Sequence, residues 1–267
     1  MSKSKESDDF GNRMKSYEAT ETSRRLNPQL PVYARIDGRA FSTFTRGMDR
    51  PFDARLTTAM IETTKHLVHK TDARIGYTQS DEISLLWLAD KPESDIFFSG
   101  KILKMASVLA SMAAAKFILL CPEEFRHRMP HFDCRVCQLP TREEAANMFL
   151  WRAMDAQKNA VSQVAHHFFS HRNLQHKNQQ DMHNMLVEKG VCFSEFPPEN
   201  RFGSFVRRVS VERELTPSEL DGIPEEHRPR RPVTRSNTVV LDMPPFKFVA
   251  NRAAVIFDGA KPVLKCE

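Results

Sequence analysis

Two acidic residues that lie far apart in the sequence stand beside short apolar segments. Asp37 ends the segment 32–37, and Asp81 lies in the tight connection 79–82 between two further segments. Carboxylates that meet at one edge of a sheet can bridge two Mg²⁺ ions roughly 3.5–4 Å apart. Mg²⁺ prefers oxygen ligands and keeps coordination positions open for phosphates. The pair therefore predicts metal-assisted chemistry on a phosphorylated substrate.

The same residues have an ordinary structural interpretation, which spacing alone does not exclude. Asp37 can cap a turn, and Asp81 and Glu82 can be solvated residues of a hairpin. Gly38 would let the backbone bend so that its carbonyl faces a metal. The amides of residues 39–42 would then face phosphate oxygens as a backbone nest. Aspartate followed by glycine is common in turns, so the surrounding elements must decide between the two interpretations.

Hydropathy patterns predict elements that bring the two carboxylates together. They indicate strands over 32–37, 73–78, 83–88 and 132–139, and helices over 53–71 and 97–120. The order βαββαβ is that of a ferredoxin-like fold, and right-handed crossovers place the first strand beside the third. Asp37 and Asp81 are then expected at the same edge of the sheet.

Beyond residue 140 the pattern indicates further helices and short strands. A capping box at Thr141 and Glu144 begins a helix that runs to about residue 169, and another helix ends near Gly190. The remaining expectations are a late strand over 201–211, a loop over 216–235, and short strands over 238–243 and 253–257. Residues 1–13 are expected to form a flexible tail.

Composition favours a cytoplasmic protein with an anionic partner. The net charge is +5, and the five cysteines are scattered, as in proteins of a reducing compartment. The N-terminal residues lack the apolar segment of a secretory signal. Polar residues interrupt the longest apolar stretch, 105–120, which is typical of a buried helix. We therefore expect no membrane association.

Several short motifs resemble those of the tRNA-histidine guanylyltransferase superfamily, and most of all its bacterial and phage branch of 3′–5′ RNA polymerases. The two main motifs are RIDGRAF at 35–41 and YTQSDEIS at 77–84. The others are MKSYE at 14–18, RPFD at 50–53, FDCRV at 132–136 and WRAMDA at 151–156. The ordered matches span roughly residues 14–208, so the role of residues 209–267 stays open.

The resemblance implies a magnesium-dependent nucleotidyltransferase. It implies a polymerase-type palm over residues 14–140, with a helical and β extension over 141–267 for RNA binding and oligomerisation. It also implies two Mg²⁺ ions held by Asp37, the Gly38 carbonyl and Asp81, with Glu82 as a supporting member of the catalytic set. The residues implied for nucleotide binding are Asp37, Gly38, Arg39, Ala40, Phe41, Ser42, Arg50, Asp53, Ser80 and Asp81.

Other residues are implied to contact the activating nucleotide or the RNA. Lys101 and Lys104 correspond to basic residues that handle the activating nucleotide or the RNA 5′ phosphate, and Arg152, Lys158 and Asn159 lie in a segment implied for RNA. Structural alternatives stay open for these residues. Arg50 can be a solvated loop residue, Asp53 an N-cap, and the lysines and Asn159 parts of solvated helix faces.

The implied reaction has two steps. ATP activates the 5′ end of a tRNA, and the 3′-hydroxyl of an incoming GTP or other NTP then attacks that end. Guanylyltransferases proper carry a His-Ile-Asn-Asn-Leu-Tyr-Asn motif where residues 157–163 read QKNAVSQ, which keeps only Asn159. This departure favours template-dependent repair of 5′-truncated tRNA over addition of guanosine at position −1.

Three other expectations accompany this interpretation. The family tends to form dimers of dimers, so the resemblance implies a homotetramer. A nucleotide cyclase on the same palm is an alternative enzyme, although the sequence has no GGDEF-like hairpin. A non-catalytic RNA-binding protein is the third alternative.

Overall fold

The computed structural model describes residues 3–228 and 232–265. Within them the strands are β1 (Val32–Gly38), β2 (Ile75–Gln79), β3 (Glu82–Trp87), β4 (Phe132–Gln138), β5 (Ser204–Arg213) and β6 (Val233–Val240). The α-helices are α1 (Lys3–Thr22), α2 (Phe41–Phe44), α3 (Ala54–Thr71), α4 (Ile102–Leu120), α5 (Arg142–Phe168), α6 (His171–Leu174), α7 (Gln179–Glu188), α8 (Pro198–Phe202), α9 (Pro217–Asp221) and α10 (Arg252–Asp258). Short 3₁₀ helices are η1 (Phe97–Gly100), η2 (Glu123–Arg128), η3 (Phe193–Glu195), η4 (Glu225–His227) and η5 (Phe246–Phe248).

The strands of the described residues form one antiparallel sheet in the order β4-β1-β3-β2-β5-β6. β1 lies beside β3, and β2 lies outside β3, as the right-handed crossovers predict. β5 continues the sheet beyond β2, where Tyr77 is paired with Phe205. The chain is therefore an α+β protein built on an antiparallel sheet.

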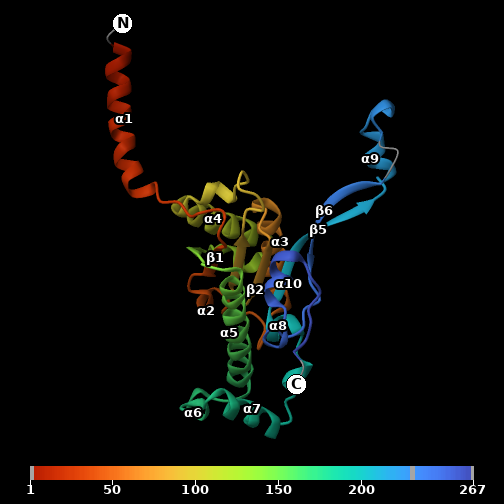
Figure 1. Cartoon of the computed structure of the whole chain (residues 1–267). Coiled ribbons are helices and arrows are strands. Elements are labelled where there is room, and N and C mark those ends of the chain that lie inside the picture. Colours follow the sequence, from red (N-terminus) through yellow and green to blue (C-terminus); the bar gives the residue numbers. More distant parts are fainter. Residues whose placement is uncertain (1–2, 229–231, 266–267) are drawn as a thin grey trace.

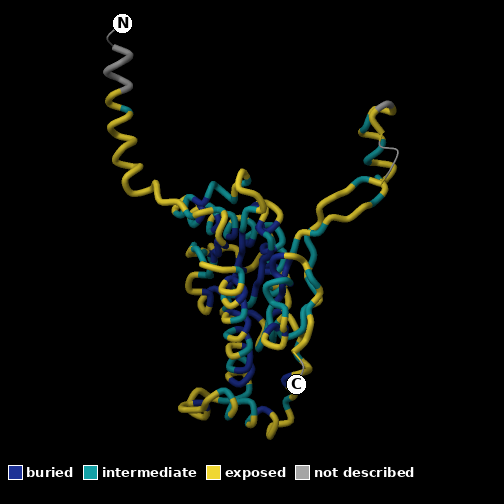
Figure 2. Tube along the Cα trace, in the orientation of Figure 1, coloured by how far each residue is buried: buried dark blue, intermediate teal, exposed yellow. Residues whose placement is uncertain are grey.

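Helices cover both faces of this sheet. α3 and α4 lie on one face, and α5 and α10 lie on the other (Figure 1). Successive side chains along each strand point to opposite faces of the sheet. Ile36 and Leu85 therefore pack with α3 and α4, whereas Tyr33 and Leu86 pack with α5. Figure 2 shows that the buried residues concentrate between these layers.

Two helix starts follow directly from local sequence. Asp53 is the N-cap of α3, because its carboxylate accepts hydrogen bonds from the amides of Arg55 and Leu56. Thr141 caps α5 in the same way, because its hydroxyl accepts the amide of Glu144 at 3.1 Å. Both predicted N-caps are confirmed. The reciprocal half of the capping box predicted at Thr141 is not found, because the Glu144 carboxylate instead accepts a hydrogen bond from the Asn147 side chain at 2.9 Å.

α4 is more apolar than we expected from the polar residues that interrupt its sequence. By length and composition alone it is long and apolar enough to cross a membrane, a test that core helices of globular proteins also pass. In this fold Met105, Leu109, Ala113 and Phe117 form its buried stripe against the sheet and α3. Leu119 lies on the opposite, exposed side of the helix.

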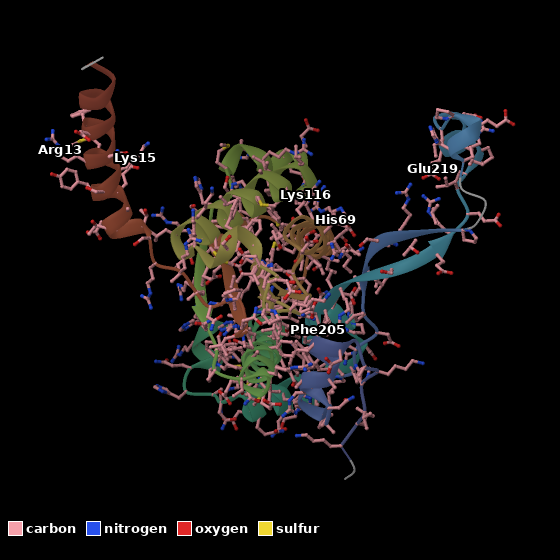
Figure 3. All side chains as sticks on the ribbon, turned by 45° about the horizontal axis from the view of Figure 1, so that its top comes forward. Arg13, Lys15, His69, Lys116, Phe205 and Glu219 are labelled. Carbon is pink, nitrogen blue, oxygen red and sulfur yellow. The ribbon has the colours of Figure 1, made fainter. Side chains whose placement is uncertain are left out.

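The N-terminal segment was expected to be a flexible tail, and that expectation is wrong for its described part. Residues 3–22 form α1, which projects from the body of the molecule and carries Arg13 and Lys15 (Figures 1 and 3). The sequence of α1 contains no proline and is rich in helix-forming residues, which explains the local conformation. Residues 1 and 2 lie outside the described residues.

Two predictions near the C-terminus are also wrong. Residues 253–257 form a helix, α10, and not a strand, because a short apolar run does not by itself distinguish the two. The predicted loop 216–235 contains α9, η4 and the start of β6, apart from 229–231, which lie outside the described residues. β5 and β6 form a hairpin that extends from the body, with Glu219 near its far end (Figure 3).

Candidate active site

Asp37 and Asp81 lie at the same edge of the sheet. The amide of Gly38 donates to the carbonyl oxygen of Asp81 at 3.0 Å, so the end of β1 is tied to the β2–β3 turn. Burial raises the pKa of Asp81, and the negative charge of Asp37 adds to this effect against a hydrogen bond from Ser80. Two carboxylates therefore share one partly buried site.

Gly38 is required here for space. Its φ is not in the left-handed region, but a Cβ at this position would lie 2.3 Å from the ring of Phe41. That ring packs against Phe44, Phe117 and Phe132 in an aromatic cluster beneath the turn. The packing of Phe41 thus draws the chain after β1 close to the sheet edge.

The backbone after Gly38 offers part of the expected phosphate nest. The amide of Arg39 donates to the carbonyl of His131 at 2.9 Å, so this amide is already committed. Ala40 adopts a left-handed conformation, with φ 54°, and turns the chain into α2. Of the amides expected in a nest, those of residues 40–42 remain for a phosphate.

Glu82 and Arg152 form a buried ion pair beside these carboxylates. Arg152 donates two hydrogen bonds of 2.6 Å to Glu82 and one of 3.1 Å to Asp155. Only 6% of Arg152 is exposed. Arg152, expected to contact RNA, is instead buried and links α5 to β3 through Glu82.

The carboxylate oxygens of Asp53 accept hydrogen bonds from its own loop and from the start of α3. Its carboxylate accepts the Asp49 amide at 3.1 Å and guanidinium hydrogen bonds from Arg55 of 2.6 and 3.1 Å, besides the cap. The Arg55 guanidinium lowers the pKa of Asp53 to about 2. Arg50 is exposed and forms no ion pair within residues 3–228 and 232–265.

A small cavity of about 120 Å³ adjoins Ser80 and Asp81. Asn159 lines it, whereas Lys158 lines a different groove beside α7. Gln163 and Asn200 also line the cavity, and no sequence motif indicated either of them. They come from α5 and α8, which only the tertiary fold brings to this edge.

Lys101 and Lys104 lie away from this edge. They stand at the start of α4, whereas Phe117, near its end, packs against Phe41. A rise of about 1.5 Å per residue separates Lys101 from Phe117 by roughly 24 Å along the helix. Within a single chain, these two lysines therefore do not lie near Asp37 and Asp81.

The oxygen donors at this edge of the sheet suit Mg²⁺ better than a metal that is bound entirely by protein side chains. No group of three or more His, Cys, Asp and Glu side chains gathers for a metal among the described residues. Mg²⁺, however, is commonly held by one or two carboxylates together with substrate phosphates. Asp37, Asp81 and the Gly38 carbonyl supply oxygen donors of this kind. A cavity of about 670 Å³ lies at the opposite end of the sheet beside Arg74 and Trp87.

Comparisons with known proteins agree with one another. The sequence profile of a family described as tRNAHis guanylyltransferase matches residues 11–140. A bacterial tRNA(His) guanylyltransferase (Thg1)-like protein, solved in complex with ATP, is 40% identical with a TM-score of 0.71, and the match covers 74% of this chain and 88% of that one. One in complex with GTP is 34% identical with a TM-score of 0.70, over 90% and 94% of the two chains. An uncharacterized protein of Acanthamoeba polyphaga mimivirus is 30% identical over 76% of this chain and 78% of its own length.

Proposed function

Because the chain belongs to the tRNAHis guanylyltransferase superfamily of nucleotidyltransferases, we propose that it adds nucleotides to the 5′ end of tRNA or tRNA-like RNA. The observation that carries this proposal is the meeting of Asp37 and Asp81 at one sheet edge, next to the hydrogen bond from Gly38 to Asp81. Bacterial relatives were solved with ATP and with GTP, which supports nucleoside triphosphates as substrates.

The proposed metal ligands are Asp37, Asp81 and the Gly38 carbonyl. Two bound Mg²⁺ ions would supply activation of an attacking oxygen and neutralisation of a leaving group. Asp37 and Asp81 would hold these ions at the sheet edge, between their own carboxylates and the phosphates of the substrate. Binding of a cation would also relieve the repulsion that helps to raise the pKa of Asp81.

The chain supplies further groups for the triphosphate. The backbone amides of residues 40–42 and the Ser80 hydroxyl are proposed to donate to phosphate oxygens. Arg50, exposed beside the site, neutralises their charge. Asp53 contributes indirectly, because it holds the 49–53 loop through the Asp49 amide.

In the proposed reaction, the 5′-monophosphate of the RNA attacks the α-phosphate of ATP, which forms an adenylylated 5′ end and releases pyrophosphate. The 3′-hydroxyl of an incoming NTP then attacks the phosphorus of the RNA 5′-phosphate and AMP leaves, so the chain grows from 3′ to 5′. We favour template-dependent 5′-end repair, because residues 157–163 keep only Asn159 of the motif found in guanylyltransferases proper. Addition of guanosine at position −1 is the alternative within the family.

The strand order supports a catalytic domain of the polymerase palm type. We propose that β4-β1-β3-β2 with α3 and α4 form a ferredoxin-like palm, which has this strand order. Residues 14–140 would form the catalytic part, and residues 141–267 the extension for RNA and for assembly into a homotetramer.

The experiment is incubation of the purified protein with Mg²⁺, labelled NTPs and a tRNA that lacks its 5′ nucleotides. The proposal predicts products lengthened at the 5′ end, with nucleotides complementary to the opposite strand. Addition of a single guanosine irrespective of that strand would indicate the −1 activity. A cyclic nucleotide product, or RNA binding without any lengthened product, would contradict the proposal.

A further inference from the structure

The sheet face that carries α5 is open to solvent along β4. Asp133, Arg135 and Cys137 of β4 are exposed, and their neighbours in register on β1 are Asp37, Arg35 and Tyr33. Side chains in register on adjacent antiparallel strands lie on the same face. We call Arg35, Asp133, Arg135 and Cys137 the open sheet face, and it ends at Asp37.

Trp151 of α5 stands at the border of the open sheet face. The guanidinium of Arg35 lies 5.7 Å from its ring centroid, and that of Arg152 lies 4.6 Å away. Glu82 fixes Arg152 through two hydrogen bonds of 2.6 Å. Two guanidinium groups thus lie beside the indole, and one of them is itself held in place by Glu82.

Half of this large aromatic residue is nevertheless open to solvent. Trp151 is 51% exposed, whereas Trp87, the second tryptophan of the chain, is 2% exposed and donates its indole N–H to the Thr71 carbonyl. Met154, which follows Trp151 by one helical turn, is also exposed. A fixed, exposed indole next to arginines is the arrangement on which unpaired bases stack.

We propose that Trp151 stacks on an unpaired base near the 5′ end of the RNA, and that Arg35 and Arg135 contact the adjoining phosphates. This inference rests on the proposed function, since it names where the RNA lies relative to Asp37. It concerns binding alone and involves no chemical step.

The shape of the surface favours a polymer over a free nucleotide. Small ligands bind in concave sites, and the small cavity beside Ser80 and Asp81 is such a site. The open sheet face is exposed along β4, so a chain can continue across it. Arg135 lies 3.6 Å from Asp133, and because both side chains are more than half exposed, phosphates can compete for this arginine.

Intrinsic fluorescence tests the proposal directly, because Trp151 is the exposed one of only two tryptophans. The protein is titrated with a 5′-phosphorylated single-stranded oligoribonucleotide in EDTA, which prevents turnover. We expect quenching that Trp151→Phe largely abolishes. Trp87→Phe should keep it, and Trp151→Phe remains informative if Trp87→Phe does not fold.

Affinity gives the second measurement. Trp151→Ala should weaken binding of the oligoribonucleotide about 5- to 150-fold, because stacking of one base contributes about 1–3 kcal/mol. Trp151→Phe should retain most of the affinity. Leu119→Ala truncates an exposed apolar residue of α4, which covers the other face of the sheet, so it is the matched control and should bind as the unaltered protein does. The thermal unfolding midpoints of the variants verify that each is folded.

The proposal would be overturned by unchanged affinity in Trp151→Ala, by equal quenching in Trp151→Phe, or by quenching by ATP or GTP alone that matches the RNA signal. An oligoribonucleotide with abasic 5′-terminal positions should quench weakly, and full quenching by it would exclude base stacking. Since the titration contains no Mg²⁺, loss of quenching is distinguishable from failure of nucleotide addition.

Discussion

Arg152 is the site residue for which the structure differs most from what the sequence led us to expect. Its motif resembles a segment implied for RNA, yet its guanidinium is bonded to Glu82, 70 positions away. A partner at that separation cannot be identified from local periodicity. By contrast, Asp37 and Asp81 could be predicted as neighbours, because strand order alone brings their strand ends together.

The buried ion pair between Arg152 and Glu82 predicts a large effect on stability. Arg152→Ala should lower the free energy of unfolding by about 3–5 kcal/mol, because it leaves the buried Glu82 carboxylate without its partner. Denaturant unfolding measures this change. The double variant Glu82→Leu/Arg152→Leu should recover most of the loss, and a single variant within about 1 kcal/mol of the original protein would contradict the account.

Asp53 predicts a specific dependence on pH. Its pKa is about 2 in the folded protein, against 3.8 for an unperturbed carboxyl, so its charge stabilises the fold above pH 3.8. That stabilisation is lost as the pH falls through 2. Asp53→Asn keeps an N-cap but removes the charge next to Arg55.

Urea unfolding between pH 5 and pH 2.5 measures this contribution. Asp53→Asn should lose less stability on acidification than the original protein does. We expect a difference of about 1 kcal/mol, since Arg55 is half-exposed and solvent screens the pair. Identical pH profiles for the two proteins would show that the carboxylate charge is not involved.

At the scale of elements, caps and periodicity predicted the central part of the fold well. α3 and α5 begin at Asp53 and Thr141, and the β2–β3 hairpin turns at residues 80 and 81 as expected. The failures lie where local pattern is ambiguous or packing decides. α10 is helical because its short apolar run packs against α5, which no local signal indicated.

The turn after β1 predicts a steric effect that is local to one element. Gly38→Ala should destabilise the protein by about 1–3 kcal/mol, because the new methyl group would meet the Phe41 ring at 2.3 Å. It should also reduce nucleotide addition, since the 37–42 segment must shift. Thermal unfolding and the addition assay measure the two effects.

A matched pair of variants isolates the cause. Phe41→Leu alone should be destabilising, because it removes the ring from the cluster with Phe117 and Phe132. Combined with Gly38→Ala it should cost less than the sum of the two changes. Strict additivity would place the origin of the glycine requirement elsewhere.

At the scale of the whole molecule, the two proposed functional parts share one core. Phe205 packs against Tyr77 and Phe149, so strands of the first part and elements of the second enclose the same apolar layer. Figure 3 shows Phe205 within the body of the molecule. The division at residue 140 is thus a proposal about function, whereas packing predicts that both parts fold together. α1 and the β5–β6 hairpin instead project from that body (Figure 1).

Ending the chain at residue 140 tests this dependence. We expect no cooperative thermal unfolding from such a fragment, because it lacks Phe149, Phe205 and α10, which cover Tyr33 and Tyr77. The full-length chain is the control. A fragment that unfolds cooperatively near the midpoint of the full chain would contradict the prediction.

The most direct test of the central claim compares 5′ nucleotide addition by Asp37→Asn and Asp81→Asn with that of the original protein at saturating Mg²⁺. Each variant removes one proposed metal-binding carboxylate while preserving its size. The account predicts that addition falls by about a thousandfold or more in both, as expected when catalytic electrostatic stabilisation is lost, while RNA affinity and thermal stability stay close to normal. Near-normal addition by either variant would contradict it.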